Sequence, residues 1–360
     1  MRARLAWFGL ALAFAPLPAV VRAGDGAPPD ASIPAADSAP TPSQVKTTYE
    51  FDADTAYVGN ARSNFGFGNK GDISEESTGG RLVVAPQVDD GPIYRFGLAF
   101  QRYSFGLSKA APLPDILQSE NLVVGMDFQL FNSWLVRAEA DPGFYNDGRA
   151  TGFRDFNVPF SIGGSYIAGD ALQWVIGLEV DVNRQIPVIP AVGVRWSIND
   201  AWVLDLILPT PRLEYQWSKN LTLYIGAGVD DGTYRMDRGF AAGMGSTKPT
   251  TVAEAGPLRE RVVGYREAVP QPPVPILQAY REKVYTTSPG TSGPNLGGAV
   301  VEYDEVRIGA GLSWKASKVL TFEIEGGYLP YREFDFHRAD FHLSNDGGAP
   351  YGRASLNAQF

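Results

Sequence analysis

The chain has 360 residues, a formal net charge of −9 at pH 7, two histidines and no cysteine. Absence of cysteine excludes disulfides, thiolate metal sites and cysteine nucleophiles, and two histidines alone do not predict a metal site. The negative charge, with no run of basic residues, argues against nucleic acid as a partner. No apolar run of 18 residues or more follows the first 23 residues, which argues against transmembrane helices. We expect no cofactor.

The first 44 residues predict export. Arg2 and Arg4 form a positive start, an apolar stretch follows over residues 5–21, and Val21-Arg22-Ala23 reads as a cleavage site between small residues. Residues 1–23 are therefore predicted to be a signal peptide. Residues 24–44 are rich in Pro, Ala, Ser and Asp, so we expect a disordered leader.

From residue 45 onward, apolar and polar residues alternate in short segments. The clearest case is YDEVRIGAGLSWKASKVLTFEIEGGYLPY, residues 303–331, where Val306, Ile308 and Leu312 share one face and Glu323 and Glu325 lie on a polar face. Alternation with a period of two over about ten residues is typical of a strand that crosses a bilayer in a closed barrel. Such segments lie roughly at 46–58, 80–88, 93–104, 120–131, 133–140, 156–168, 171–183, 188–198, 201–208, 211–218, 220–230, 303–315, 319–330 and 352–360.

The connections between these segments alternate in length. Tight turns occur at Asp89-Asp90-Gly91 and residues 316–318, for example, whereas long connections are predicted at residues 59–79, 105–119, 141–155, 231–302 and 331–351. Membrane barrels have short periplasmic turns and longer outer loops. The sequence therefore predicts an all-β fold over residues 45–360, a transmembrane antiparallel up-and-down β-barrel of about 14 strands, with twelve or sixteen as alternatives.

Tryptophan positions support a membrane location. Six tryptophans follow the signal peptide, and each lies near a predicted short turn, in the apolar set of its strand. An indole ring favours the boundary between lipid and water, so these rings are predicted to form an interface girdle. The chain ends on an alternating segment and an aromatic residue, which resembles the signal read by the outer-membrane assembly machinery. The predicted interface residues are Trp134, Trp174, Trp196, Trp202, Trp217, Trp314 and Phe360.

Two stretches resemble a family of bacterial outer-membrane barrels of unassigned function. They are VIPAVGVRWSINDAWVLDLILPTPRLEYQWSKNLTLYIGAGVD, residues 188–230, and LTFEIEGGYLPYREFDFHRADFHLSNDGGAPYGRASL, residues 320–356. The likeness covers most of residues 90–230 and 303–360. It implies the fold and an outer-membrane location. The predicted partners, from the strand pattern and the terminal Phe360, are outer-membrane lipid and the assembly machinery. The likeness implies no activity, and the oligomeric state cannot be predicted.

Charged residues gather on the face opposite the apolar set. An arginine or lysine facing lipid would cost roughly 2–4 kcal/mol near the bilayer midplane, so these side chains are predicted to line the lumen. They could set the selectivity of a water-filled channel. They could equally form salt bridges between strands that keep the lumen closed. The predicted lumen-lining residues are Arg95, Asp127, Arg137, Glu139, Glu179, Asp181, Arg195, Asp205, Arg212, Glu214, Arg307, Glu323 and Glu325.

The segment 231–302 is predicted to be a long outer loop with one short helix at residues 276–285. Its apolar residues suggest that part of it packs on something, so it could plug the lumen, cap it or stay disordered.

One pattern resembles catalytic chemistry. His342 and Ser344 stand two residues apart, so on a strand an imidazole could share a face with a hydroxyl and deprotonate it. Outer-membrane lipid hydrolases carry such a pair, but this one is predicted to lie in a polar outer loop without an orienting partner. The charged residues around His337, Arg332 among them, are predicted to form a solvated rim.

The sequence thus predicts a non-enzymatic outer-membrane barrel. A porin-like channel or uptake barrel for small solutes is the favoured function. A structural or surface-interaction barrel with a closed lumen is the alternative, and a lipid hydrolase is a remote one.

Overall fold

The computed structural model describes residues 45–65, 70–108, 111–131, 133–169, 171–240 and 296–360, together with the backbone of residues 250–266 and 274–288. The chain divides into two compact units, one within residues 1–241 and 296–360 and one within residues 242–295. The predicted signal peptide and leader lie outside the described residues.

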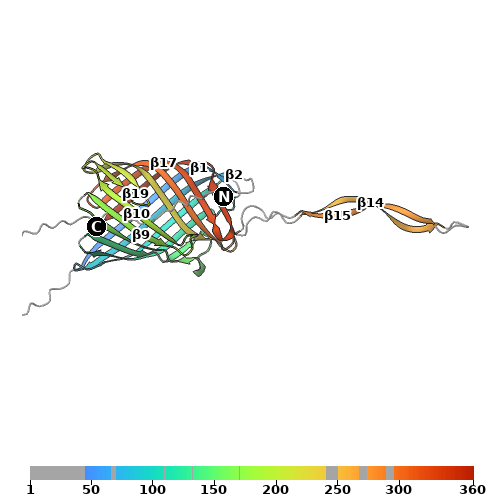
Figure 1. The fold of residues 1–360 in the computed structure, drawn as a ribbon, viewed down its shortest axis with the longest axis horizontal. Coiled ribbons are helices and arrows are strands. Elements are labelled where there is room, and N and C mark those ends of the chain that lie inside the picture. The colour runs from blue at the N-terminus through green and yellow to red at the C-terminus, as the bar shows by residue number, and fades with distance from the viewer. Residues whose placement is uncertain are drawn as a thin grey trace, which may run out of the picture. The chain divides into compact units, whose positions relative to one another are not determined.

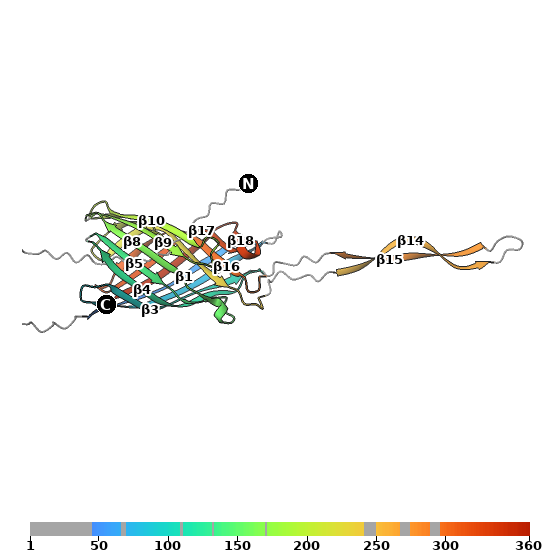
Figure 2. The ribbon, with the colours of Figure 1, turned by 60° about the horizontal axis from the view of Figure 1, so that its bottom comes forward.

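The first unit is a closed antiparallel barrel of 14 strands, which confirms the predicted fold class. The wall closes because β1 pairs with both β2 and β19. Three of the 14 positions in the wall are each filled by two short consecutive segments, β5 with β6, β7 with β8, and β18 with β19. The strands tilt across the barrel (Figures 1 and 2), as closure of a sheet requires.

The strands of the barrel have these bounds: β1 Val45–Asn64, β2 Lys70–Val88, β3 Ile93–Leu107, β4 Ile116–Leu130, β5 Trp134–Ala140, β6 Gly143–Asn146, β7 Phe156–Asn157, β8 Phe160–Ile167, β9 Leu172–Val180, β10 Val188–Ser197, β11 Trp202–Asp205, β12 Arg212–Gln216, β13 Leu221–Arg235, β16 Val300–Lys315, β17 Leu320–Phe336, β18 Phe341–Asn345 and β19 Ala349–Gln359. Short 3₁₀ turns lie at Phe153–Asp155 and His337–Ala339. Among the described residues, no helix is long and apolar enough to cross a membrane.

Several predicted long connections are wrong because the strands continue through them. β1 and β2 leave only residues 65–69 between them, β3 and β4 leave residues 108–115, and β17 runs on to Phe336. Register shifts at Val58/Ala61 and at Val306/Ile308 change which face each residue occupies. A bulge of this kind breaks the simple alternation without ending the hydrogen-bonded ladder. Sequence periodicity therefore stops before the strands do.

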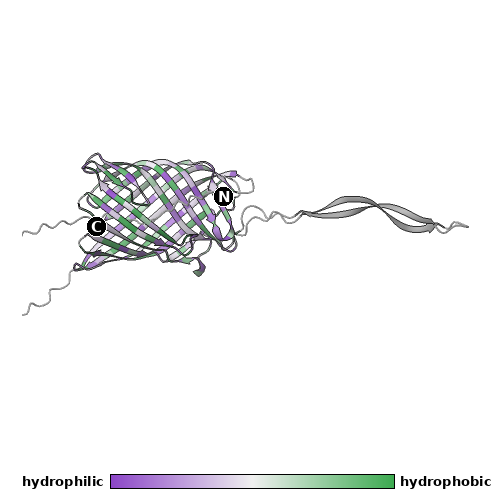
Figure 3. Cartoon of the chain, in the orientation of Figure 1, coloured by the Kyte–Doolittle hydropathy of each residue, from purple (hydrophilic) through white to green (hydrophobic). Residues whose placement is uncertain are grey.

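The barrel wall is apolar outside and polar inside. Large apolar side chains such as Phe96, Leu98, Ile225, Ile308 and Ile324 are exposed on the outer surface. Figure 3 shows hydrophobic and hydrophilic residues alternating along the strands. A contiguous exposed apolar surface of this size is unfavourable in water and suits contact with lipid.

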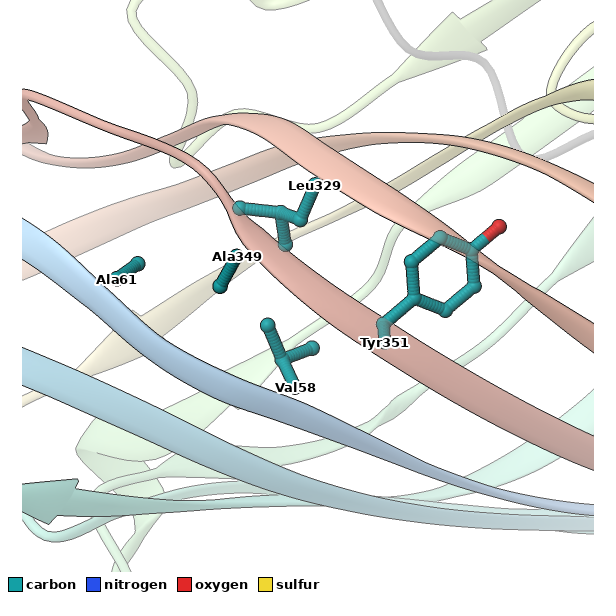
Figure 4. Packing of buried hydrophobic residues seen from close by; sticks show 5 residues of the cluster. All are labelled: Val58, Ala61, Leu329, Ala349 and Tyr351. Atoms are coloured by element: carbon teal, nitrogen blue, oxygen red, sulfur yellow. The ribbon is translucent and has the colours of Figure 1, made fainter.

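One end of the barrel carries the short turns, together with the first residues of β1 and the last residues of β19. It is called here the short-turn end, and the other end is the long-loop end. Toward the long-loop end the interior is filled with side chains. Figure 4 shows one such cluster, in which Val58 and Ala61 of β1 meet Leu329, Ala349 and Tyr351 of β17 and β19. Four of these five side chains have no solvent exposure at all. The barrel is therefore not an open tube along its whole length.

The second unit contains a two-stranded antiparallel ribbon, β14 (Thr250–Arg266) paired with β15 (Val274–Ser288). The helix predicted at residues 276–285 is therefore wrong. β-branched and aromatic residues are frequent in this segment, and they favour a pleated strand over a helix. The bounds predicted for the long loop are also wrong, because residues 231–235 belong to β13 and residues 300–302 to β16. A plug or cap formed by this segment stays a prediction.

Candidate functional site

The lumen contains three cavities among the described residues. A short-turn cavity of about 360 Å³ lies between the first residues of β3 and strands β4, β5, β8 and β10, near the short turns. A central cavity of about 610 Å³ follows, lined on one side by β1 to β3 and on the other by β12 and β13. A side cavity of about 160 Å³ lies between β8, β9 and β13. Arg137 lines all three, so it stands where they meet.

All 13 residues predicted to line the lumen either line one of these cavities or form an ion pair inside the barrel. Arg195 pairs with Asp205 and with Glu214, the latter at 3.2 Å, near the short-turn end. Arg212 reaches across the interior to Glu323, at 3.2 Å, and to Glu325, at 3.8 Å. The remaining members line the cavities or lie deeper in the barrel: Arg95, Asp127, Arg137, Glu139, Glu179, Asp181 and Arg307.

A compact ion-pair network separates the short-turn cavity from the central one. Nε and Nη2 of Arg137, which form one edge of its guanidinium group, donate to the two oxygens of Asp127, each at 2.7 Å. Arg95 donates to both oxygens of Glu50, at 3.0 and 2.6 Å, and to Glu139 at 3.3 Å. Paired, planar contacts of this kind are the strong form of charged hydrogen bond. The network therefore holds the side chains between these two cavities in a fixed arrangement, with both signs of charge present.

Sequence reasoning missed part of the central cavity. Glu50, Asp52 and Asp54 lie on β1, and Arg81 and Arg353 line the same space from β2 and β19. The three acidic residues occur at every second position, so they share one face of their strand. That spacing was visible in the sequence and could have placed them in the lumen.

At the long-loop end, aromatic rings from strands that are not neighbours in the wall contact each other. The ring of Tyr103 on β3 lies 4.9 Å from that of Tyr303 on β16, and Phe105 lies 5.1 Å from Phe334 on β17. Tyr234 on β13 lies 6.3 Å from Tyr103. Rings at these distances are in direct packing contact. This set, called here the aromatic plug, closes the axial path at that level.

Beneath the aromatic plug lies a fully buried ion cluster. Glu75 receives hydrogen bonds from Tyr303 at 2.6 Å and from Arg307 at 3.1 Å, and its carboxylate lies 2.8 Å from a nitrogen of Arg332. Glu305 also pairs with both arginines. Glu75 and Glu305 have no side-chain exposure and Arg332 has 1%. The predicted solvated rim is therefore wrong for Arg332, which a register shift turns inward.

The predicted interface residues lie near the short turns. Trp174, Trp196, Trp202, Trp217, Trp314 and Phe360 are exposed, and Trp134 is half-buried. The rings also contact neighbours on adjacent strands: Trp134 meets Tyr166, Trp202 meets Tyr215, and Trp314 stacks on Phe322. The structure thus places an aromatic belt at one end of the apolar surface, where such rings favour a lipid boundary.

His342 and Ser344 lie in strand β18, so the loop predicted for them is wrong. Pairing with β17 places Asp335 opposite His342 and Glu333 opposite Ser344. The structure thus supplies a carboxylate beside the histidine that the sequence did not reveal. Glu333 beside the hydroxyl would oppose negative charge developing on Ser344, which does not favour nucleophilic chemistry. In the described part of the chain, no group of three or more His, Cys, Asp or Glu side chains is placed to hold a metal ion.

No protein-family model matches the chain, and no curated protein matches it. The resemblance to a family of unassigned function therefore stays a prediction.

Several solved structures share its general shape. An outer-membrane channel from Pseudomonas putida F1 is 11% identical, with 87% of this chain and 95% of that chain covered and a TM-score of 0.39. TodX, a toluene transporter of Pseudomonas putida, is 8% identical over 87% and 89% of the two chains, with a TM-score of 0.35. LpxR from Salmonella typhimurium is 11% identical over 86% and 99%, with a TM-score of 0.32. These values are too low to carry information about function.

Proposed function

We propose that this protein is an outer-membrane barrel that passes small polar solutes through its lumen. The observation that carries the proposal is the set of three cavities, each lined in part by charged side chains, that meet at Arg137 inside an apolar wall. Their lining carries both carboxylates and guanidinium groups, which can replace the hydration of a polar or zwitterionic solute. The short-turn end would face the periplasm and the long-loop end the exterior, as in other barrels of this kind.

A closed barrel with a structural or surface role is the second candidate. The aromatic plug and the buried ion cluster favour it, because both fill the axial path with packed side chains. The two candidates differ in one measurable property, which is solute flux across a bilayer.

Reconstitution in planar bilayers and in liposomes tests the proposal. We expect discrete conductance steps in NaCl, and swelling of liposomes in arabinose and in glycine. Arg137→Ala should raise the conductance and shift the preference toward cations, because it widens the meeting point of the cavities and removes one positive charge. Arg154→Ala is the matched control, since this arginine is exposed in the 3₁₀ turn between β6 and β7 and lines none of the three cavities.

Absence of conductance and swelling in both the wild type and Arg137→Ala would refute the channel and support the closed barrel. An equal change in Arg137→Ala and Arg154→Ala would show that lumen geometry does not control the current.

A further inference from the structure

The height of the barrel wall is uneven. β9 and β10 have nine and ten residues, and β11 and β12 have four and five. β13, which pairs with β12, is much longer with 15 residues, and β1 on the opposite side of the barrel has 20. A tilted strand needs about 9–11 residues to cross the apolar part of a bilayer. The wall from β9 to β12 therefore rises little above the apolar span, whereas β13 extends well past it.

Above that hairpin, the hydrogen-bonded ladder of the wall is interrupted. β10 pairs with β11 only from Arg195 to Ser197, and β13 pairs with β12 only from Thr222 to Gly226. Three further backbone bonds join the hairpin tip to its neighbours, from Val229 and Ala227 of β13 to Pro209 and Pro211, and from Leu206 to Val194 of β10. No pairing joins β10 to β13 among the described strands. Leu208 of the tip packs on Ile189 of β10, so the opening called here the side gap lies above the tip, between the upper ends of β9 and β10 and residues 230–235 of β13.

The upper part of β13 turns away from this side gap toward the opposite wall. Arg235 at its end forms a parallel pair with Asn146 of β6, and Asp147 accepts a hydrogen bond from the backbone of Asp237 at 3.0 Å. β6 and β13 are separated by several strands on either side of the barrel. A small shift of β13 would therefore not bring it into pairing with β10 across the side gap.

Two of the three lumen cavities reach the side gap. The central cavity is lined by Pro209 and Thr210 of the tip and by Asp230 and Gly232 of β13. The side cavity is lined by Asp181 and Arg184 of the loop between β9 and β10, together with Asp231. The polar lumen thus extends sideways to the place where the wall is incomplete, while the aromatic plug closes it axially.

The loop at residues 181–187 covers the side gap through charged contacts. Arg184 lies 2.6 Å from Asp231 of β13 and 3.7 Å from Glu302 of β16, and its side chain is only 3% exposed. The backbone of Gln185 donates to Glu302 at 3.0 Å, and Thr233 donates to Asp181 at 2.6 Å. The outer surface of the loop carries exposed Val182 and Ile186. Few residues hold this loop to β13 and β16, and nearly all of the contacts are polar.

We propose that solutes pass through the side gap rather than along the barrel axis, and that loop 181–187 is its gate. This inference rests on the proposed channel function and names its route. Arg184 is a positioning residue that holds the gate closed by joining the loop to β13 and β16. The solutes it admits are small polar molecules that fit the central cavity of about 610 Å³.

A reversible cross-link tests the route, and the chain has no cysteine to interfere. The double variant Gln185→Cys with Glu302→Cys joins the gate to β16. The control, Lys70→Cys with Asp346→Cys, replaces a salt bridge of 2.5 Å at the axial mouth. Cross-linking is confirmed by mass spectrometry, and a short bismaleimide replaces the disulfide where the thiols stand too far apart. Arabinose flux into liposomes is measured before and after cross-linking, and after reduction where a disulfide forms.

We expect cross-linking of the gate to abolish most of the flux, reduction of the disulfide to restore it, and the control cross-link to leave it unchanged. Arg184→Gln should raise the flux several-fold without any cross-link, whereas Arg154→Gln, at an exposed arginine that lines none of the three cavities, should not. The side route would be overturned if cross-linking removed flux only in the Lys70/Asp346 variant. It would also be overturned if the gate variant and the control variant lost flux equally, or if neither variant lost any. Absence of flux in the wild type and in Arg184→Gln would instead refute the channel itself.

Discussion

Replacing Glu75 with alanine is expected to lower the free energy of unfolding by about 3–5 kcal/mol, the usual cost of removing one partner from a buried ion pair. Its carboxylate contacts Arg307, Arg332 and the hydroxyl of Tyr303, and the side chain has no exposure. Without it, the buried guanidinium groups of Arg307 and Arg332 share the carboxylate of Glu305, and Arg307 keeps its ion pair with Asp230. The loss is measured by guanidinium unfolding in detergent micelles, and by the temperature at which the barrel loses its resistance to SDS.

Glu76→Ala is the matched control, because this neighbouring glutamate is exposed. Its substitution should change the unfolding free energy by less than about 1 kcal/mol, as is typical of surface charges. The double variant Glu75→Leu with Arg332→Leu should recover part of the stability lost in Glu75→Ala, because apolar groups replace a whole pair. If Glu75→Ala and Glu76→Ala unfold alike, the ion cluster does not stabilise the barrel.

The regions predicted well from the sequence are those where one face of a strand meets lipid and the other meets the lumen. In β16 and β17, Ile308, Leu312 and Ile324 face outward while Glu323 and Glu325 face inward. The contrast between these two environments imposes alternation on the sequence. The number of strands and the turns that join them at the short-turn end could therefore be predicted.

The long-loop end could not be predicted, because the same contrast is lost there. Glu75 falls in a segment expected to be a loop, although residues 70–88 form one strand. Residues 73–79 carry polar side chains on both faces, so alternation gives no signal. The side gap depends on where the pairing of the β11–β12 hairpin with β10 and β13 stops, and such pairing is a property of the three-dimensional arrangement that no single segment encodes. Arg184, in the loop between β9 and β10, carried no sequence signal that separated it from an ordinary loop arginine.

A second large effect on stability is expected from a substitution at Gly327, where β17 lies close against β16. Gly327 is paired with Gly309, and a Cβ added to Gly327 would collide with the backbone of Ile308 and Gly309. Backbone atoms held in a ladder cannot move aside as a flexible side chain can, so the two strands would have to separate. Gly327→Ala should therefore destabilise the barrel by about 1–3 kcal/mol or more, and reduce the fraction that assembles into an SDS-resistant form.

Gly228→Ala provides a control with the opposite sign. Gly228 lies in β13 opposite Arg307, and a Cβ added there meets no atom within 4 Å. Alanine restricts the unfolded chain more than glycine does, so this variant should gain about 0.5–1 kcal/mol. Both glycines lie in strand interiors and face the lumen. The difference in unfolding free energy between the two variants therefore measures the effect of the close approach of β16 and β17, separated from the general effect of adding a methyl group. Equal stability of Gly327→Ala and Gly228→Ala would show that β16 and β17 can part without cost.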